Sequence, residues 1–116
     1  MRSPYLKQQG STKVLMVDDS PFVMLAGELH NSNSSTPEAM EASCRKAAEL
    51  GMNSVIATLS WELIEPEEGC FDFSTVDMVI DIARKHGLKL ELIWFGSWKN
   101  AQCAYAPAWV KKDLNR

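Results

Sequence analysis

The sequence predicts an α/β fold in which helices connect the strands of a parallel sheet. Apolar runs of strand length alternate with helical patterns, and the expected helices carry start and stop signals. The core strands recur about every 30 to 35 residues, the length of one βα unit with a right-handed crossover. The length of 116 residues, with 46% hydrophobic and 23% charged residues, fits one globular domain.

The chain is expected to open with a β-hairpin. Residues 13–17 form an apolar run of strand length, and residues 22–26 form a second one. Between them, the composition of residues 18–21 (Asp-Asp-Ser-Pro) favours a turn, because Asp and Ser side chains can mimic backbone hydrogen bonds and proline presets φ. The second strand is expected to run into the core.

The first helix is predicted to begin at Thr36, a capping hydroxyl, with Pro37 in the first helical position. Gly51 is the expected stop. Residues 54–60 then form a nearly continuous apolar run, which is typical of a strand buried on both faces. Four residues at helical spacing form the expected buried side of this helix: Met40, Cys44, Ala47 and Ala48.

A second helix is predicted to follow Ser74, which with Asp77 resembles a capping box. The last turn is basic and includes His86, which suits the helix dipole, and Gly87 ends the helix. Residues 88–95 are the third expected buried strand, and a short helix is expected over 107–114. The apolar face of the second helix is formed by Val76, Val79, Ile80 and Ala83.

Composition argues against several classes of partner. The net charge of −3 and the scattered basic residues disfavour nucleic acid and anionic membranes. No apolar run approaches the roughly 20 residues of a membrane span. The first ten residues are polar, so we expect no signal peptide and a cytoplasmic chain as the sequence stands. Cys44, Cys70 and Cys103 form no Cys-x-x-Cys pair, so we expect reduced thiols, no metal and no cofactor.

Polar and aromatic residues follow each predicted core strand. In parallel α/β folds the ligand lies at the carboxyl ends of the strands, so these residues are expected to share one site. Carboxylates and amides hydrogen-bond sugar hydroxyls, and an indole face can stack on a pyranose ring, so the set suits a carbohydrate. The candidate residues are Glu28, His30, Asn31, Trp61, Glu62, Glu65, Trp98 and Asn100.

Structural roles are alternatives for several of these residues. Glu28 and Glu62 could be framework ion pairs, since such pairs also occur in clefts. His30 could be a hydrogen-bonded structural histidine. Trp61 and Trp94 could simply belong to the core, where aromatic side chains are common. Trp98, beside glycine and asparagine in a loop, is harder to explain in this way.

Four motifs follow one another along the chain. They are Ala26-Gly27-Glu28-Leu29-His30, then Trp61-Glu62-Leu63-Ile64-Glu65-Pro66 with Gly69, Phe71 and Phe73, then residues 94–100, and finally Pro107-Ala108-Trp109. In this order they resemble the motifs of glycoside hydrolase family 35, the β-galactosidases, a family related to family 42. The resemblance covers nearly the whole chain, including the opening hairpin.

The resemblance implies a TIM (β/α)8 barrel, of which residues 1–116 would form an incomplete N-terminal portion, a single partial catalytic domain. A whole barrel takes about 250 residues, so the chain would hold about three βα units plus the hairpin. It also implies a retaining mechanism that uses two glutamates. Their expected positions, after the fourth and seventh strands, lie beyond Arg116. We therefore expect no catalytic residue here and a truncated fragment that is inactive alone.

The resemblance further implies that Glu28, His30, Glu62, Trp98 and Asn100 contact a terminal β-linked sugar, while Trp61 and Glu65 hold the pocket. The sequence also departs from the familiar β-galactosidases. Those enzymes carry an aromatic residue and an arginine in the stretch that holds Asn31 and Asn33 here. They have a glutamate where this chain has Ser97, and usually an asparagine where it has Glu62. The motifs therefore imply glycoside binding more directly than a preference for galactose.

Two other functions are alternatives. A non-catalytic carbohydrate-binding or interaction protein could derive from a decayed barrel. A small flavodoxin-like or nucleotide-binding domain would need a glycine-rich loop after the first core strand, and residues 26–30 are not one. In a lone three-stranded parallel sheet, residues 88–95 would be an unpaired edge, so poor solubility or self-association is expected.

Overall fold

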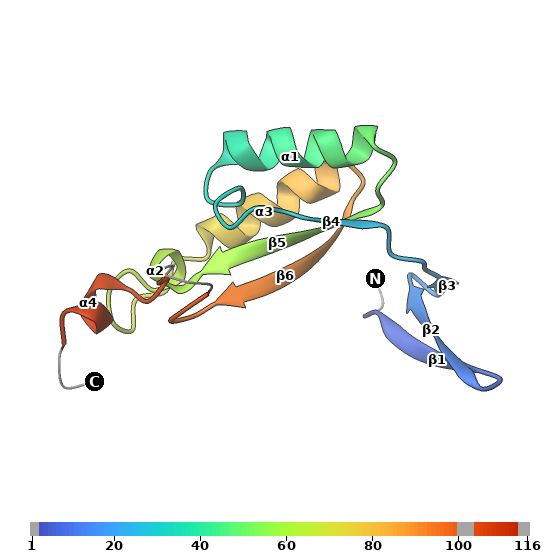
Figure 1. Ribbon diagram of the computed structural model, residues 1–116, viewed down its shortest axis with the longest axis horizontal. Coiled ribbons are helices and arrows are strands. Elements are labelled where there is room, and N and C mark those ends of the chain that lie inside the picture. The colour runs from blue at the N-terminus through green and yellow to red at the C-terminus, as the bar shows by residue number, and fades with distance from the viewer. Residues whose placement is uncertain (1–2, 100–103, 114–116) are drawn as a thin grey trace.

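A computed structural model of the protein describes residues 3–99 and 104–113. Two three-stranded sheets are present in these ranges, one antiparallel and one parallel. Two long helices cover one side of the parallel sheet (Figure 1). The antiparallel sheet lies beyond the amino ends of the parallel strands, and two short helices lie near their carboxyl ends (Figure 1). This layout is that of successive βα units, as in the first part of a (β/α)8 barrel.

The antiparallel sheet consists of β1 (Tyr5–Gln9), β2 (Thr12–Val17) and β3 (Ser20–Pro21). Asp18 and Asp19 form the two-residue loop between β2 and β3, both with positive φ (50° and 61°). Positive φ at both central residues is the requirement of a type I′ hairpin turn, which Asp tolerates better than most residues. The turn predicted over residues 18–21 is therefore confirmed, with its loop at the two aspartates.

The strand predicted over residues 22–26 is wrong, because residues 22–25 form no strand, and β1 was not foreseen. β3 holds only two residues, and the chain then runs as an exposed link in which Val23 is 77% and Leu25 57% exposed. These apolar side chains gave a strand pattern, but they cover no core in the described structure. β1 is largely polar and exposed, so it lacks the alternation that identifies a half-buried strand.

The Asn53 side chain fixes the link to the parallel sheet. Its Nδ2 donates to the Val23 carbonyl oxygen at 2.7 Å, and its Oδ1 accepts from the Leu25 backbone N–H at 2.8 Å. A second tie comes from Lys89, whose Nζ donates to Asp18 Oδ2 at 2.7 Å. The Asn53 side-chain amide therefore supplies hydrogen-bond partners to backbone groups of Val23 and Leu25, which lie outside any strand.

The parallel sheet has the order β4 (Ala26–Glu28), β5 (Ser54–Ser60) and β6 (Lys89–Phe95). β5 is nearly fully buried, as predicted. β6 lies at the edge of the sheet, as expected. Its apolar sequence also predicted a buried strand, but Leu92 is 40% and Trp94 54% exposed. The reason is that no strand lies beyond it among the described residues.

The first long helix is α1 (Pro37–Glu49). The Oγ1 of Thr36 accepts from the backbone N–H of Ala39 at 3.3 Å, which confirms the predicted cap. Gly51 follows with a φ of +76°, as the predicted stop requires. Ala48 was predicted to be buried with Met40, Cys44 and Ala47, but it is exposed. It lies one position after Ala47 and so points away from the row of side chains that faces the sheet.

The second long helix is α3 (Ser74–Lys85), and the predicted capping box is wrong. Ser74 is the first helical residue and not the cap. The Asp72 carboxylate instead accepts from the backbone N–H of Ser74 at 2.8 Å. Hydrogen bonds from the Ser74 hydroxyl and backbone hold the pKa of Asp72 below its ordinary value.

The core lies between the two long helices and the sheet. α1 and α3 are joined at its rim by Glu41, whose Oε1 contacts the Nζ of Lys85 at 2.8 Å and the Nε2 of His86 at 2.9 Å. His86 thus lies at the end of α3 beside a carboxylate. The buried core residues are Met40, Cys44, Ala47, Val55, Ala57, Val79, Ala83 and Leu88.

The cysteines and short helices complete the description. Burial raises the pKa of the Cys44 thiol, and Cys70 is an exposed free thiol, while Cys103 lies outside the described residues. The short helices are α2 (Trp61–Ile64) and α4 (Ala108–Lys111), the latter within the predicted 107–114 segment. No helix within the described ranges is long and apolar enough to cross a membrane.

Candidate functional site at the carboxyl ends of the strands

The first segment of the candidate site follows β4. Glu28 and His30 are exposed, and Asn31 is half-buried beside them. Together with Leu29 they line a shallow cavity of about 290 Å³. Glu28 pairs in register with Ile56 of β5, so its side chain lies on the sheet face opposite the one that α1 and α3 cover. The strand end therefore presents a carboxylate and an imidazole to open space.

A buried polar network anchors the loop after β4. The Ser34 hydroxyl donates to the carbonyl oxygen of Thr58 and lies 3.1 Å from its Oγ1. The Oγ1 of Thr58 donates in turn to the Asn31 carbonyl oxygen at 2.8 Å. Because Ser34 and Thr58 are only 1% and 2% exposed, these bonds form where water cannot replace them.

The second segment is built around Glu65. The indole Nε1 of Trp61 donates to its Oε2 at 2.7 Å, and the backbone N–H of Gly69 donates to its Oε1 at 2.8 Å. These two donors hold the pKa of Glu65 below its ordinary value, the Trp61 bond contributing most. Trp109 completes the group: its indole donates to the Glu65 carbonyl oxygen at 3.0 Å, and its ring meets Trp61 edge-on at 5.8 Å.

Glu62 connects the second segment with α4. Its Oε2 accepts from the Nζ of Lys111 at 3.1 Å, and its backbone N–H donates to the Tyr105 carbonyl oxygen at 2.9 Å. The same Lys111 ammonium donates to the Ala104 carbonyl oxygen at 3.3 Å. Glu62 is therefore an ion-paired residue that is half-buried, which agrees with the structural role considered above.

The third segment follows β6 and carries an exposed indole. Trp98 is 67% exposed, while Phe95 at the strand end is 2% exposed. Tyr105 packs its ring on Phe95 at 4.9 Å, and Lys99 places its Nζ 4.8 Å from the same phenyl centre. The backbone N–H of Tyr105 donates to the Ser97 carbonyl oxygen at 3.2 Å. Asn100, the last predicted site residue, lies outside the described residues.

The sequence that carries these three segments matches a known family. The family model described as "Glycosyl hydrolases family 35" matches residues 14–114. The chain belongs to glycosyl hydrolases family 35. The resemblance inferred from the sequence motifs is thereby confirmed.

Curated relatives of this family 35 chain are β-galactosidases. Beta-galactosidase BgaB of Geobacillus sp. (strain Y412MC61) is 40% identical over 63 residues, covering 53% of this chain and 8% of the relative. Beta-galactosidase of Xanthomonas manihotis is 38% identical over 58 residues, 49% of this chain and 9% of the relative. Beta-galactosidase 11 of Arabidopsis thaliana is 27% identical over 103 residues, 84% of this chain and 12% of the relative. The chain thus spans about a tenth of their length.

Solved structures share the fold. The exo-beta-1,4-mannosidase Op5Man5 from Opitutaceae bacterium strain TAV5 has a TM-score of 0.65 and 18% identity, over 83% of this chain and 18% of that structure. A GH5_18 protein from Bifidobacterium longum subsp. longum, in complex with Manb1-4GlcNAc, has a TM-score of 0.58 and 18% identity. The match covers 76% of this chain and 23% of that structure. These TIM-barrel glycoside hydrolases confirm the barrel-type fold predicted for the family 35 chain.

The structure brings the predicted site residues together unevenly. Glu28, His30 and Asn31 line one cavity, and Trp61 is bonded to Glu65. In the described ranges, no cluster of three or more His, Cys, Asp and Glu side chains could hold a metal ion. Four contributing residues escaped the sequence analysis, because only contacts distant in sequence reveal them. They are Ser34, Thr58, Tyr105 and Lys111.

Proposed function

We propose that this family 35 chain forms part of the sugar-binding wall of a glycoside hydrolase that removes terminal β-linked galactose. The observation that carries the proposal is the family match over residues 14–114. The β-galactosidase names of the curated relatives support the choice of galactose. Retaining enzymes of this kind use two carboxyl groups about 5 to 5.5 Å apart on either side of the bond that breaks.

Within this chain the residues divide by role. Glu28 and His30 are exposed at a strand end, where their oxygen and nitrogen atoms can bond sugar hydroxyls. The broad exposed face of Trp98 suits stacking on a pyranose ring. Glu65 is bonded through both carboxylate oxygens, and its lowered pKa keeps it ionised, so it suits a positioning role better than that of a general acid.

The test is calorimetric titration of the protein with D-galactose and with lactose, comparing the wild type with Trp98→Ala. Loss of one stacked aromatic ring is expected to weaken binding about tenfold. Trp94→Ala is the matched control, because Trp94 is also an exposed indole but pairs with Leu59 on the helix-covered side of the sheet. Absence of binding, or equal weakening in both variants, would contradict the proposal.

Hydrolysis of p-nitrophenyl β-D-galactopyranoside, measured on the same samples, is expected to be absent, because none of the sugar-binding residues proposed here is one of the two catalytic glutamates. Release of nitrophenol would contradict this division of roles. Specific binding that depends on Trp98, without hydrolysis, agrees both with the sugar-binding wall of a hydrolase and with a non-catalytic carbohydrate-binding protein built on the same fold.

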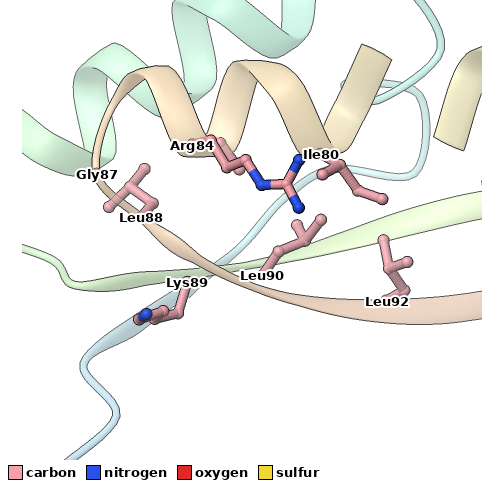
Figure 2. A pocket seen from close by; sticks show the side chains of 8 residues that line it. Ile80, Arg84, Gly87, Leu88, Lys89, Leu90 and Leu92 are labelled. Carbon is pink, nitrogen blue, oxygen red and sulfur yellow. The ribbon is translucent and has the colours of Figure 1, made fainter. Parts of the chain in front are cut away.

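We also propose that the exposed edge of the sheet associates with a second copy of the chain. β6 pairs only with β5 in the described structure, which leaves backbone donors and acceptors along its other side. A groove of about 470 Å³ runs beside it, where Ile80 and Arg84 of α3 face Leu90 and Leu92 of β6 (Figure 2). Pairing of two such edges would cover both the backbone and the groove.

The elution volume at several protein concentrations tests this association. The wild type is expected to elute as a dimer or larger species, and Leu92→Lys to shift the equilibrium toward the monomer, since a charge at an edge disfavours pairing. Leu63→Lys is the control, because Leu63 is similarly exposed (39%) but lies in α2. A monomeric wild type at every concentration would exclude the association.

A further inference from the structure

A side-chain hydrogen bond links Tyr105, which follows Trp98 in the chain, to the loop after β4. The Nδ2 of Asn31 donates to the phenolic oxygen of Tyr105 at 2.9 Å, across 74 positions of sequence. This bond joins the first segment of the candidate site to the third. The sequence motifs predict that Asn31 binds the sugar and predict no role for Tyr105.

The Asn31 end of the tie is anchored in the core. Its carbonyl oxygen accepts from the Oγ1 of Thr58, and Thr58 is held by Ser34. Both hydroxyl residues are almost completely buried. A side chain whose backbone is fixed in this way loses little further freedom on forming its own bond, so the contact with Tyr105 is preorganised.

The Tyr105 end reaches the peptide next to Trp98. The Tyr105 backbone N–H donates to the carbonyl oxygen of Ser97, the residue directly before Trp98. Its ring packs on the buried Phe95, and its carbonyl oxygen accepts from the backbone N–H of Glu62. Tyr105 thus connects all three segments, and its phenolic oxygen is the point that Asn31 holds.

We infer that Asn31 and Tyr105 are positioning residues, which hold the Trp98 loop in the place where its indole can stack on a sugar ring. That Trp98 stacks on a sugar rests on the proposed function. That Asn31 and Tyr105 hold the loop is argued from their contacts alone. A binding site needs such support because a loose aromatic face must lose its freedom each time a ligand binds. Direct contact of Asn31 with the sugar is the competing role.

The test compares two matched pairs of variants. Tyr105→Phe removes only the phenolic oxygen and keeps the ring on Phe95; its control is Tyr5→Phe, which loses a similar bond to Asp19 in the hairpin. Asn31→Ala removes the amide; its control is Asn33→Ala, from the same loop, whose Nδ2 donates to the Ser43 hydroxyl at the same 2.9 Å. Circular dichroism verifies that each variant folds.

The first readout needs no sugar. The order of the Trp98 indole N–H, from ¹⁵N relaxation, is expected to fall in Tyr105→Phe and Asn31→Ala and to stay at the wild-type value in both controls. The second readout is affinity for D-galactose, expected to fall about fivefold in both test variants, the value of one ordinary hydrogen bond.

The outcomes are distinct. Unchanged order of the Trp98 indole in Tyr105→Phe overturns the inference, whatever happens to binding. Weakened binding in Asn31→Ala but not in Tyr105→Phe also overturns it, and assigns Asn31 to the sugar directly. If the order of the Trp98 indole N–H falls as expected but the wild type binds no galactose, the positioning role is supported and the proposed function is contradicted.

Discussion

Glu65 shows how one residue of a motif can organise the backbone and the aromatic side chains around it. Its two carboxylate oxygens accept from Trp61 and from the backbone N–H of Gly69. Glu65→Gln leaves only one oxygen acceptor for two donors, so one donor loses its partner. We expect the melting temperature at pH 7 to fall by about 4 °C in a thermal melt followed by circular dichroism.

Glu67→Gln is the control for this prediction. Glu67 is an exposed carboxylate in the same acidic loop, and its replacement is expected to change the melting temperature by less than about 1 °C. Equal melting temperatures for the wild type and Glu65→Gln would show that the two bonds add nothing to stability.

Gly27 makes a second prediction at the scale of one residue. A Cβ atom at this position would lie 2.8 Å from the Sδ of Met52, which is closer than van der Waals contact allows. Because Sδ and Cε are the flexible end of the Met52 side chain and can shift, Gly27→Ala is expected to lower the free energy of unfolding by about 1 kcal/mol, the low end for overpacked substitutions. Chemical denaturation with urea measures the difference.

A double variant identifies the cause. In a Met52→Ala background the clash partner is gone, so the same Gly27→Ala change is expected to cost far less. If the losses in free energy of unfolding of the two single variants simply add in the double variant, the effect comes from the backbone of β4 and not from the clash with Met52.

At the scale of the elements, the sequence was informative where the signal was local. The Thr36-Pro37 start of α1 and the apolar run of β5 were predicted correctly, because caps and buried runs depend on neighbouring residues. β1, and the exposure of the β6 side chains whose apolar run predicted a buried strand, depend on which strands lie alongside. No pattern within residues 5–9 or 89–95 carries that information.

The start of α3 gives the prediction at this scale. Ser74 and Asp77 match a capping box, but the structure places the Asp72 carboxylate on the Ser74 backbone N–H. Asp72→Ala should therefore lower the melting temperature by about 4 °C, while Asp77→Ala should lower it by much less. A larger effect for Asp77→Ala would restore the capping box that the sequence suggested.

At the scale of the whole molecule, the candidate site was predicted better as a location than as a set of contacts. The strand ends were identified from the sequence, and the structure places Glu28, His30 and Trp98 there with exposed side chains. The partner in the ion pair of Glu62 and the role of Asn31 were not predictable, since Lys111 and Tyr105 are 49 and 74 positions away.

Acid sensitivity is a property of the molecule as a whole. The pKa values of four described carboxyl groups are lowered in the folded protein by the donors beside them. A group with a lowered folded pKa adds stability above its unfolded value, and that stability is lost as the pH falls through the folded value. The four groups are Asp18, Glu41, Glu65 and Asp72, with ordinary values of 3.8 or 4.5.

Melting temperatures measured from pH 7 down to pH 3 are therefore expected to decline, with the steepest fall below the ordinary carboxyl value of 4.5. Glu41→Gln isolates one contribution, because Glu41 joins α1 to α3 through Lys85 and His86. The variant should be less stable than the wild type at pH 7, and the difference should shrink as the pH falls through the lowered pKa of Glu41, where the wild-type side chain also becomes protonated. A constant difference across this range would mean that the side-chain amide fails to replace the carboxylate for steric reasons, and that the charge of Glu41 contributes nothing to the tie between the helices.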